Sequence, residues 1–168
     1  IGVKKALLNT IHGYTATQKL VDSPDAKDWR RGRAGAHNIV PSSTGAAISV
    51  AEAVQGMKGL FDGIAMRVPV ITGSIADFTF LAARETSVEE VNGILKKAAG
   101  ELRWSKVFSV TEEQLVSSDI IGNPHASIAD LSLTRVVGGD LVKVLAWYDN
   151  EMGYVHTLIE HVLEVSKK

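Results

Sequence analysis

The stretch "ASIADLSLTRVVGGDLVKVLAWYD", from Ala126 to Asp149, decides the fold class. Two runs rich in aliphatic residues flank the tripeptide Gly138-Gly139-Asp140, and this pattern is typical of two antiparallel strands joined by a tight turn. Segments rich in β-branched and aromatic residues predict further strands at 1–12, 63–70, 73–85 and 103–110. We therefore expect a sheet that is largely antiparallel.

Helical segments are predicted from capping residues and apolar spacing. A helix is expected to begin near Thr44, whose hydroxyl can accept a hydrogen bond from a free backbone N–H. Ser87 and Glu90 form a capping box ahead of a helix over 91–102, and the segment 151–168 carries an apolar stripe at helical spacing. Because strands and helices do not alternate strictly, we predict an α+β domain. Its parts are a largely antiparallel mixed sheet, helices packed on one face, a long loop and a C-terminal helix.

The composition is that of an ordinary globular protein. With 168 residues, of which 45% are hydrophobic and 22% charged, a single domain over 1–168 is expected. The net charge of -1 leaves no basic field to hold the phosphates of a nucleic acid. No apolar run approaches the roughly 20 residues that cross a bilayer. We expect a cytoplasmic protein whose partners include neither nucleic acid nor membrane.

The chain contains no cysteine, which excludes disulfides, thiolate metal sites and cysteine catalysis within it. It also has no cluster of metal-ligand residues and no glycine-rich dinucleotide fingerprint, so no metal site is expected. The sequence starts at Ile1 without a methionine, inside a segment that already alternates in polarity. We therefore expect a fragment of a longer protein.

His12, at the end of the first expected strand, is the natural general base. The unperturbed pKa of histidine is about 6.5, so this side chain can exchange a proton at neutral pH, although a purely structural histidine is the alternative. Thr15 and Thr17 stand two residues apart, so in an extended segment both hydroxyls would face one side and donate to a shared oxyanion. The alternative for the two threonines is a solvated loop, because residues 13–41 are polar and hold no regular period.

Two places in the sequence suit an anion. The segment "SSTGAA" at 42–47 combines hydroxyls, Gly45 and the free N–H groups of a helix start, which favour a phosphate. The alternative for this segment is an ordinary helix N-cap, which needs the same residue types. Arg67 lies in an apolar strand, where its guanidinium needs either a bound phosphate or an ion pair with a carboxylate.

The segment "WYDNEMGY", from Trp147 to Tyr154, joins the last expected strand to the last helix. Asn150 can hold the amide of a cofactor through paired hydrogen bonds, and Tyr154 can pack beside the cofactor ring. As a helix cap, Asn150 has an equally good structural reason to stand here.

Taken in chain order, four motifs resemble the catalytic domain of phosphorylating glyceraldehyde-3-phosphate dehydrogenase over nearly the whole chain. They are "HGYTATQKLVDSPDAKDWRRGRAGAHNIVPSSTGAA", "GIAMRVPV", "VSSDIIG" and "WYDNEMGY". In that family a cysteine thiolate attacks the aldehyde, a histidine takes up the proton as hydride passes to NAD or NADP, and inorganic phosphate releases an acyl phosphate. The resemblance implies a glycolytic parent that converts glyceraldehyde 3-phosphate to 1,3-bisphosphoglycerate.

The resemblance also implies roles for individual residues. His12 matches the family histidine, which lowers the pKa of the thiol by ion pairing. The implied binding positions are Thr15, Thr17 and Arg67 for the substrate phosphate, Thr44 and Gly45 for inorganic phosphate, and Asn150 and Tyr154 for the nicotinamide of NAD or NADP.

Residues 13–39 resemble the family's S-loop, which lines the cofactor site of a neighbouring subunit and helps to build a homotetramer. The helix at 151–168 is expected to pack on an NAD(P)-binding domain. In the family, that domain and the cysteine precede the part represented here, so this chain alone is expected to be inactive. The alternative is a standalone, non-catalytic module that keeps the fold for assembly or phosphate binding.

Overall fold

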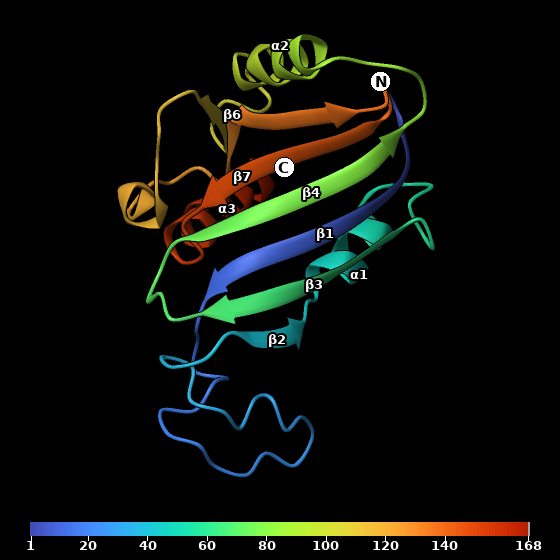
Figure 1. The fold of residues 1–168 in the computed structure, drawn as a ribbon. Coiled ribbons are helices and arrows are strands. Elements are labelled where there is room, and N and C mark those ends of the chain that lie inside the picture. Colours follow the sequence, from blue (N-terminus) through green and yellow to red (C-terminus); the bar gives the residue numbers. More distant parts are fainter. Residues whose placement is uncertain (168) are drawn as a thin grey trace.

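The computed structural model describes residues 1–167, which form a seven-stranded mixed sheet with helices beside it (Figure 1). The strands are β1 (Val3–Gly13), β2 (Val40–Ser43), β3 (Phe61–Val68), β4 (Ser74–Ala82), β5 (Phe108–Thr111), β6 (Ser127–Val137) and β7 (Leu141–Tyr148). The helices are α1 (Ala46–Ala53), α2 (Val88–Ala99), α3 (Met152–Val165) and the 3-10 helix η1 (Ser117–Ile120). The strand order β2-β3-β1-β4-β7-β6-β5 confirms the predicted α+β class.

Most neighbouring strands are antiparallel, as predicted. Only two pairs, β1 with β3 and β5 with β6, run parallel within the described sheet. The β6–β7 hairpin is the one expected from the sequence. Its turn places Gly138 and Gly139 at φ 59° and 80°, a region where a residue with a Cβ is strained.

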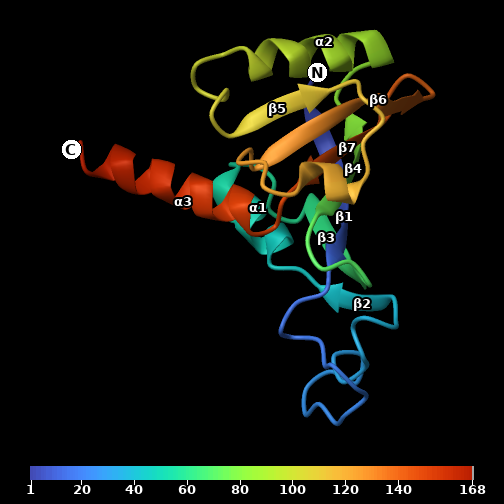
Figure 2. The same ribbon diagram turned by 90° about the vertical axis from the view of Figure 1, so that its left-hand side faces the viewer.

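The helices lie on one face of the sheet, which Figure 2 shows nearly edge-on. The opposite face is turned toward the viewer in Figure 1, and no helix among residues 1–167 covers it. The core forms between the sheet and α2. Its buried members are Ala6, Phe80, Ala82, Val91 and Val142, and Phe78 stacks on Phe80 with ring centroids 5.1 Å apart.

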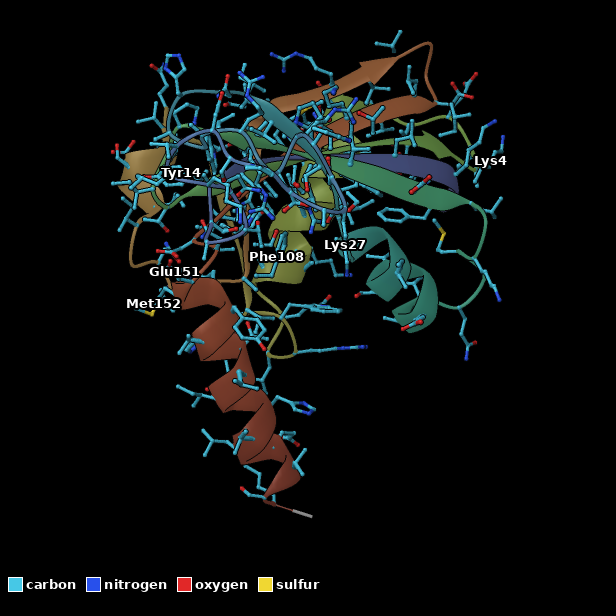
Figure 3. The ribbon with its side chains drawn as sticks, turned by 90° about the horizontal axis from the view of Figure 1, so that it is seen from below. Lys4, Tyr14, Lys27, Phe108, Glu151 and Met152 are labelled. Carbon is cyan, nitrogen blue, oxygen red and sulfur yellow. The ribbon has the colours of Figure 1, made fainter. Side chains whose placement is uncertain are left out.

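Helix α3 leads away from the sheet. Figure 3 labels Glu151 and Met152 at its start and shows the later turns projecting outward. Four apolar side chains along α3 remain 47–58% exposed: Val155, Leu158, Ile159 and Val162. The predicted apolar stripe is therefore present and uncovered in the chain. The last residue of the predicted segment, Lys168, lies outside the described residues.

The first helix begins at Ala46, close to the expected start near Thr44. Two other local predictions were wrong in detail. Residues 103–107 form turns, so β5 begins only at Phe108. Ser87 caps α2 by accepting from the Glu90 N–H at 3.2 Å, but the Glu90 carboxylate binds Arg84 and the Thr86 hydroxyl instead of closing the capping box. These two partners lower the pKa of Glu90 to about 2.

None of the helices within residues 1–167 combines the length and the apolar character needed to cross a membrane.

The core predicts an asymmetry between the two faces of the sheet. Phe80 is 8% exposed and faces α2, whereas Leu7 is 65% exposed on the open face. We expect Phe80→Ala to lower the free energy of unfolding by about 3–5 kcal/mol, because the lost contacts leave a cavity. Leu7→Ala should change it by less than about 0.5 kcal/mol. Urea denaturation of both variants measures the difference, and equal losses would contradict this assignment of the core.

Candidate functional site

The site is built at the ends of the two parallel strands. In the β1–β3 register His12 stands opposite Arg67. The Nδ1 atom of His12 lies 2.6 Å from Nη1 of Arg67 and 2.6 Å from the carbonyl oxygen of Gly13. The same Nη1 donates to the Gly13 carbonyl at 3.2 Å. The His12 ring also meets the ring of Tyr148 edge-on, with centroids 6.0 Å apart.

The environment of His12 favours the neutral imidazole. Burial and the positive charge of Arg67 lower its pKa, while the Gly13 carbonyl, which can accept a hydrogen bond from the protonated ring, opposes the shift. An imidazole that stays neutral at physiological pH is able to accept a proton. The role of His12 as a general base stays a prediction, and which ring nitrogen can accept a proton depends on the contacts of Nδ1.

Arg67 lies close to the histidine without a carboxylate to neutralise it. The ion pairs found among residues 1–167 do not include Arg67, and its buried Nε atom has no hydrogen-bond partner there. Burial lowers the pKa of the guanidinium, which nevertheless stays charged. Of the two explanations drawn from the sequence, the ion pair is wrong, and donor groups remain free for an anion.

Thr15 and Thr17 come together, but not in the predicted way. Their hydroxyl oxygens lie 2.9 Å apart. The segment is a turn rather than an extended strand, because the Gln18 N–H donates to the Thr15 carbonyl at 2.9 Å. The Gln18 side chain in turn accepts from the Thr15 N–H. Neither hydroxyl bonds Arg67 within the described chain.

Thr44 and Gly45 lie apart from the histidine. In the β2–β3 register Val40 stands opposite Arg67 and Ser43 opposite Ile64. Thr44 and Gly45 follow Ser43, which lies three residues beyond the position opposite Arg67. At the rise of a β-strand this separates the start of α1 from the histidine by roughly 10 Å or more. The Thr44 hydroxyl accepts from the Ala46 N–H at 3.2 Å, one residue ahead of Gly45, the N-cap of α1. The space beside Gly45 is open, so an anion can approach its backbone.

A pocket of about 360 Å³ joins His12 to the segment between β7 and α3. Asn150 and Tyr154 line it together with Tyr148 and Gly153. A side chain at position 153 would meet the carbonyl of His125 at 3.0 Å, which explains the glycine in "NEMGY". The structure therefore brings together three of the predicted site residues, His12, Asn150 and Tyr154.

Asn150 is oriented by the turn between β3 and β4. Its Oδ1 accepts from the Gly73 N–H at 3.0 Å and from the Ser74 hydroxyl at 3.1 Å. This leaves Nδ2 as a donor, so the predicted paired hydrogen bonds to a cofactor amide are wrong. A single hydrogen bond from Nδ2 to a carbonyl oxygen is what the geometry allows.

Asp149, not Asn150, binds the free N–H groups at the start of α3, whose N-cap residue is Glu151. The Asp149 carboxylate accepts from the N–H groups of Glu151, Met152 and Gly122 at 2.8–2.9 Å. Burial raises the pKa of Asp149, but these hydrogen bonds outweigh burial and hold the pKa below its usual value. Aspartate and asparagine both favour a helix start, so the sequence alone does not choose between Asp149 and Asn150. The choice depends on Gly122, which the fold brings within hydrogen-bonding distance of Asp149.

Tyr148 is one of the pocket residues that sequence reasoning missed. Burial raises the pKa of its hydroxyl, while Ser74, Arg67 and Thr10 lower it. The only local signal was a tyrosine at the end of an apolar strand, which is more often a core residue.

The Arg67–His12 contact predicts a measurable pKa. In a histidine NMR titration we expect His12 to titrate below about 6.5, the ordinary value. Replacing the arginine in Arg67→Ala should raise the pKa, because a nearby positive charge disfavours the imidazolium. Since the folded-state pKa is lowered, the associated stability is present above the unfolded pKa and is lost as the pH falls. Arg103→Ala, which removes an exposed guanidinium elsewhere, is the control; an unchanged His12 pKa in Arg67→Ala would contradict the coupling.

Comparison with known proteins shows the family to which the chain belongs. Residues 1–150 match the family model for the glyceraldehyde 3-phosphate dehydrogenase C-terminal domain. Glyceraldehyde-3-phosphate dehydrogenase 2 of Streptomyces avermitilis is 48% identical over 160 residues, which cover 95% of this chain and 47% of the relative. The Mycobacterium bovis BCG enzyme of that name is 46% identical over 166 residues, 99% of this chain and 48% of the relative.

A fungal relative shows a similar level of identity. Glyceraldehyde-3-phosphate dehydrogenase 1 of Kluyveromyces lactis is 45% identical over 165 residues, which cover 96% of this chain and 50% of the relative. The chain spans about half the length of the curated relatives it matches. It belongs to the glyceraldehyde 3-phosphate dehydrogenase family, as a C-terminal domain of that family.

Proposed function

We propose that this chain supplies the catalytic domain of a glycolytic oxidoreductase. The parent converts glyceraldehyde 3-phosphate, phosphate and NAD or NADP to 1,3-bisphosphoglycerate. The observation that carries this proposal is the neutral His12 in one pocket with the free amide of Asn150, beside an unneutralised guanidinium on Arg67. The reaction requires a general base, a group that orients the cofactor and a cation that binds phosphate, and His12, Asn150 and Arg67 can supply these in turn.

His12 acts as the proton acceptor. A thiol nucleophile must lose its proton before it attacks an aldehyde, and a neutral imidazole beside it takes that proton up. The chain itself has no cysteine, so the thiol comes from a part of the parent outside this sequence. By itself the chain is expected to turn over no substrate.

The residues of the pocket fit a nicotinamide. With its Oδ1 held by Gly73 and Ser74, Asn150 directs Nδ2 as a single donor for the carbonyl oxygen of a carboxamide. Tyr154, 69% exposed at the rim, offers an aromatic ring beside it. When bound, the cofactor supplies the hydride acceptor; the chain holds the ring near His12.

Two phosphate positions complete the proposal. Arg67, with the paired hydroxyls of Thr15 and Thr17, takes the phosphate of the substrate. Thr44 and Gly45, at the open start of α1, take inorganic phosphate. The unpaired donors of Arg67 and the free space beside Gly45 support these roles.

The remaining parts serve assembly. The loop at 13–39 lines the cofactor site of a neighbouring subunit in a homotetramer, and α3 packs on the NAD(P)-binding domain of its own subunit. The exposure of Leu20 and Trp29, 88% and 86%, and of the apolar stripe on α3 supports both contacts. The protein works in the cytoplasm.

Phosphate binding can be tested on the chain as it stands. At ten times its dissociation constant, phosphate should stabilise the fold by about 1.4 kcal/mol, which raises Tm by about 3–6 °C. Arg67→Ala should reduce the shift, while Arg103→Ala should keep it. Thermal unfolding in phosphate is compared with chloride of equal ionic strength, and no difference between the two salts would contradict a phosphate site.

The catalytic role makes one prediction for the isolated chain and another for the full-length parent. Mixed with substrate, phosphate and cofactor, the isolated chain should produce no reduced cofactor. Within the full-length parent, His12→Asn should lower kcat by about 10²–10⁴-fold, because the base is removed. Absorbance of the reduced nicotinamide measures both. A parent that retains full activity in His12→Asn would favour the non-catalytic alternative for this domain.

A further inference from the structure

The contacts around His12 present a chemical conflict. Its Nδ1 lies 2.6 Å from the Gly13 carbonyl oxygen, which can only accept, and 2.6 Å from Nη1 of Arg67, which can only donate. A neutral imidazole nitrogen is either a donor or an acceptor. Only one of the two contacts can therefore be a hydrogen bond at any time.

With Arg67 in place, the arginine contact decides the tautomer. The two hydrogens of Nη1 serve Nδ1 and the Gly13 carbonyl, which also lies within 3.2 Å of it. Nδ1 must then carry its lone pair, and the ring proton must be on Nε2. In this form Nε2 donates and cannot accept a proton from a thiol.

Without Arg67, the carbonyl contact decides the tautomer. Nδ1 then carries the proton and donates to the Gly13 carbonyl at the distance already present. Nε2, which makes no hydrogen bond within residues 1–167, is left with a free lone pair, and the His12 side chain lines the pocket. This is the tautomer that acts as a base.

We propose that Arg67 is a positioning residue that holds His12 in the inactive Nε2–H tautomer until an anion draws the guanidinium away. The anion is a phosphate, so this inference rests on the phosphate role of Arg67 under the proposed function. The ring loses a proton from Nε2 to solvent and gains one at Nδ1, so its charge does not change.

The free energy of the exchange favours movement of Arg67 once an anion arrives. Its Nε is buried without a partner, and no carboxylate within the described chain neutralises the side chain. A phosphate offers bidentate, charge-assisted hydrogen bonds, which are stronger than the two bonds that Arg67 gives up, to a neutral imidazole and to the Gly13 carbonyl. Departure of Arg67 also converts the lone-pair contact between Nδ1 and the Gly13 oxygen into a hydrogen bond.

The experiment is a two-bond nitrogen–proton correlation spectrum of the histidine rings, which distinguishes the two neutral tautomers directly. It is recorded on the wild-type chain at a pH where His12 is neutral, without and with inorganic phosphate. The cross-peaks that disappear in His12→Gln identify the ring. Binding of phosphate is followed separately by the line width of its phosphorus signal.

We expect the Nε2–H tautomer to predominate without phosphate and the Nδ1–H tautomer to predominate at saturation. Arg67→Ala should show Nδ1–H in both conditions, and Arg103→Ala, the matched control, should behave as the wild type. Because the wild-type spectra alone test the switch, the proposal stays testable even where Arg67→Ala fails to fold.

The outcomes separate this inference from the function on which it rests. Phosphate that binds without changing the tautomer overturns the switch and leaves the phosphate site intact. An Nδ1–H ring already present in the phosphate-free wild type overturns the switch as well. Absence of any phosphate binding overturns both the switch and the proposed phosphate role of Arg67.

Discussion

Two neighbouring strands that run in the same direction cannot be joined by a tight turn, and β1 and β3 are such a pair. The chain between them has to return to the starting end of the sheet, and residues 14–60 make this return through a long loop, β2 and α1. The same pairing brings the ends of both strands to one place, where His12 stands opposite Arg67. The loop, the added strand and the site thus follow from one pairing.

This end of the sheet gathers more donors than acceptors. The carboxylate that lines the pocket, Asp149, is already occupied by the N–H groups that fix α3 to its strand. Within residues 1–167 it forms no ion pair with Arg67, whose positive charge lowers the pKa of His12. The positive charge of Arg67 is therefore unbalanced, and a bound anion would balance it.

The sequence predicted the elements whose signal is local. The β6–β7 hairpin follows from Gly138 and Gly139, and α3 follows from the spacing of its apolar residues. Predictions that depended on a distant partner were less accurate. The side-chain oxygen of Asn150 binds Gly73, which lies 77 positions earlier, and spacing could not reveal this partner because the sheet brings the two residues together. A local choice also differed from the pattern, because the Glu90 carboxylate binds Arg84, six positions earlier, instead of closing the capping box.

The fixed orientation of Asn150 has a stereochemical consequence. A primary carboxamide has an accepting end and a donating end, and a pocket residue that can only donate distinguishes between them. Exchanging the two ends of a bound carboxamide would break this bond, so the turn at Gly73 and Ser74 decides which end of such a ligand Asn150 can hold.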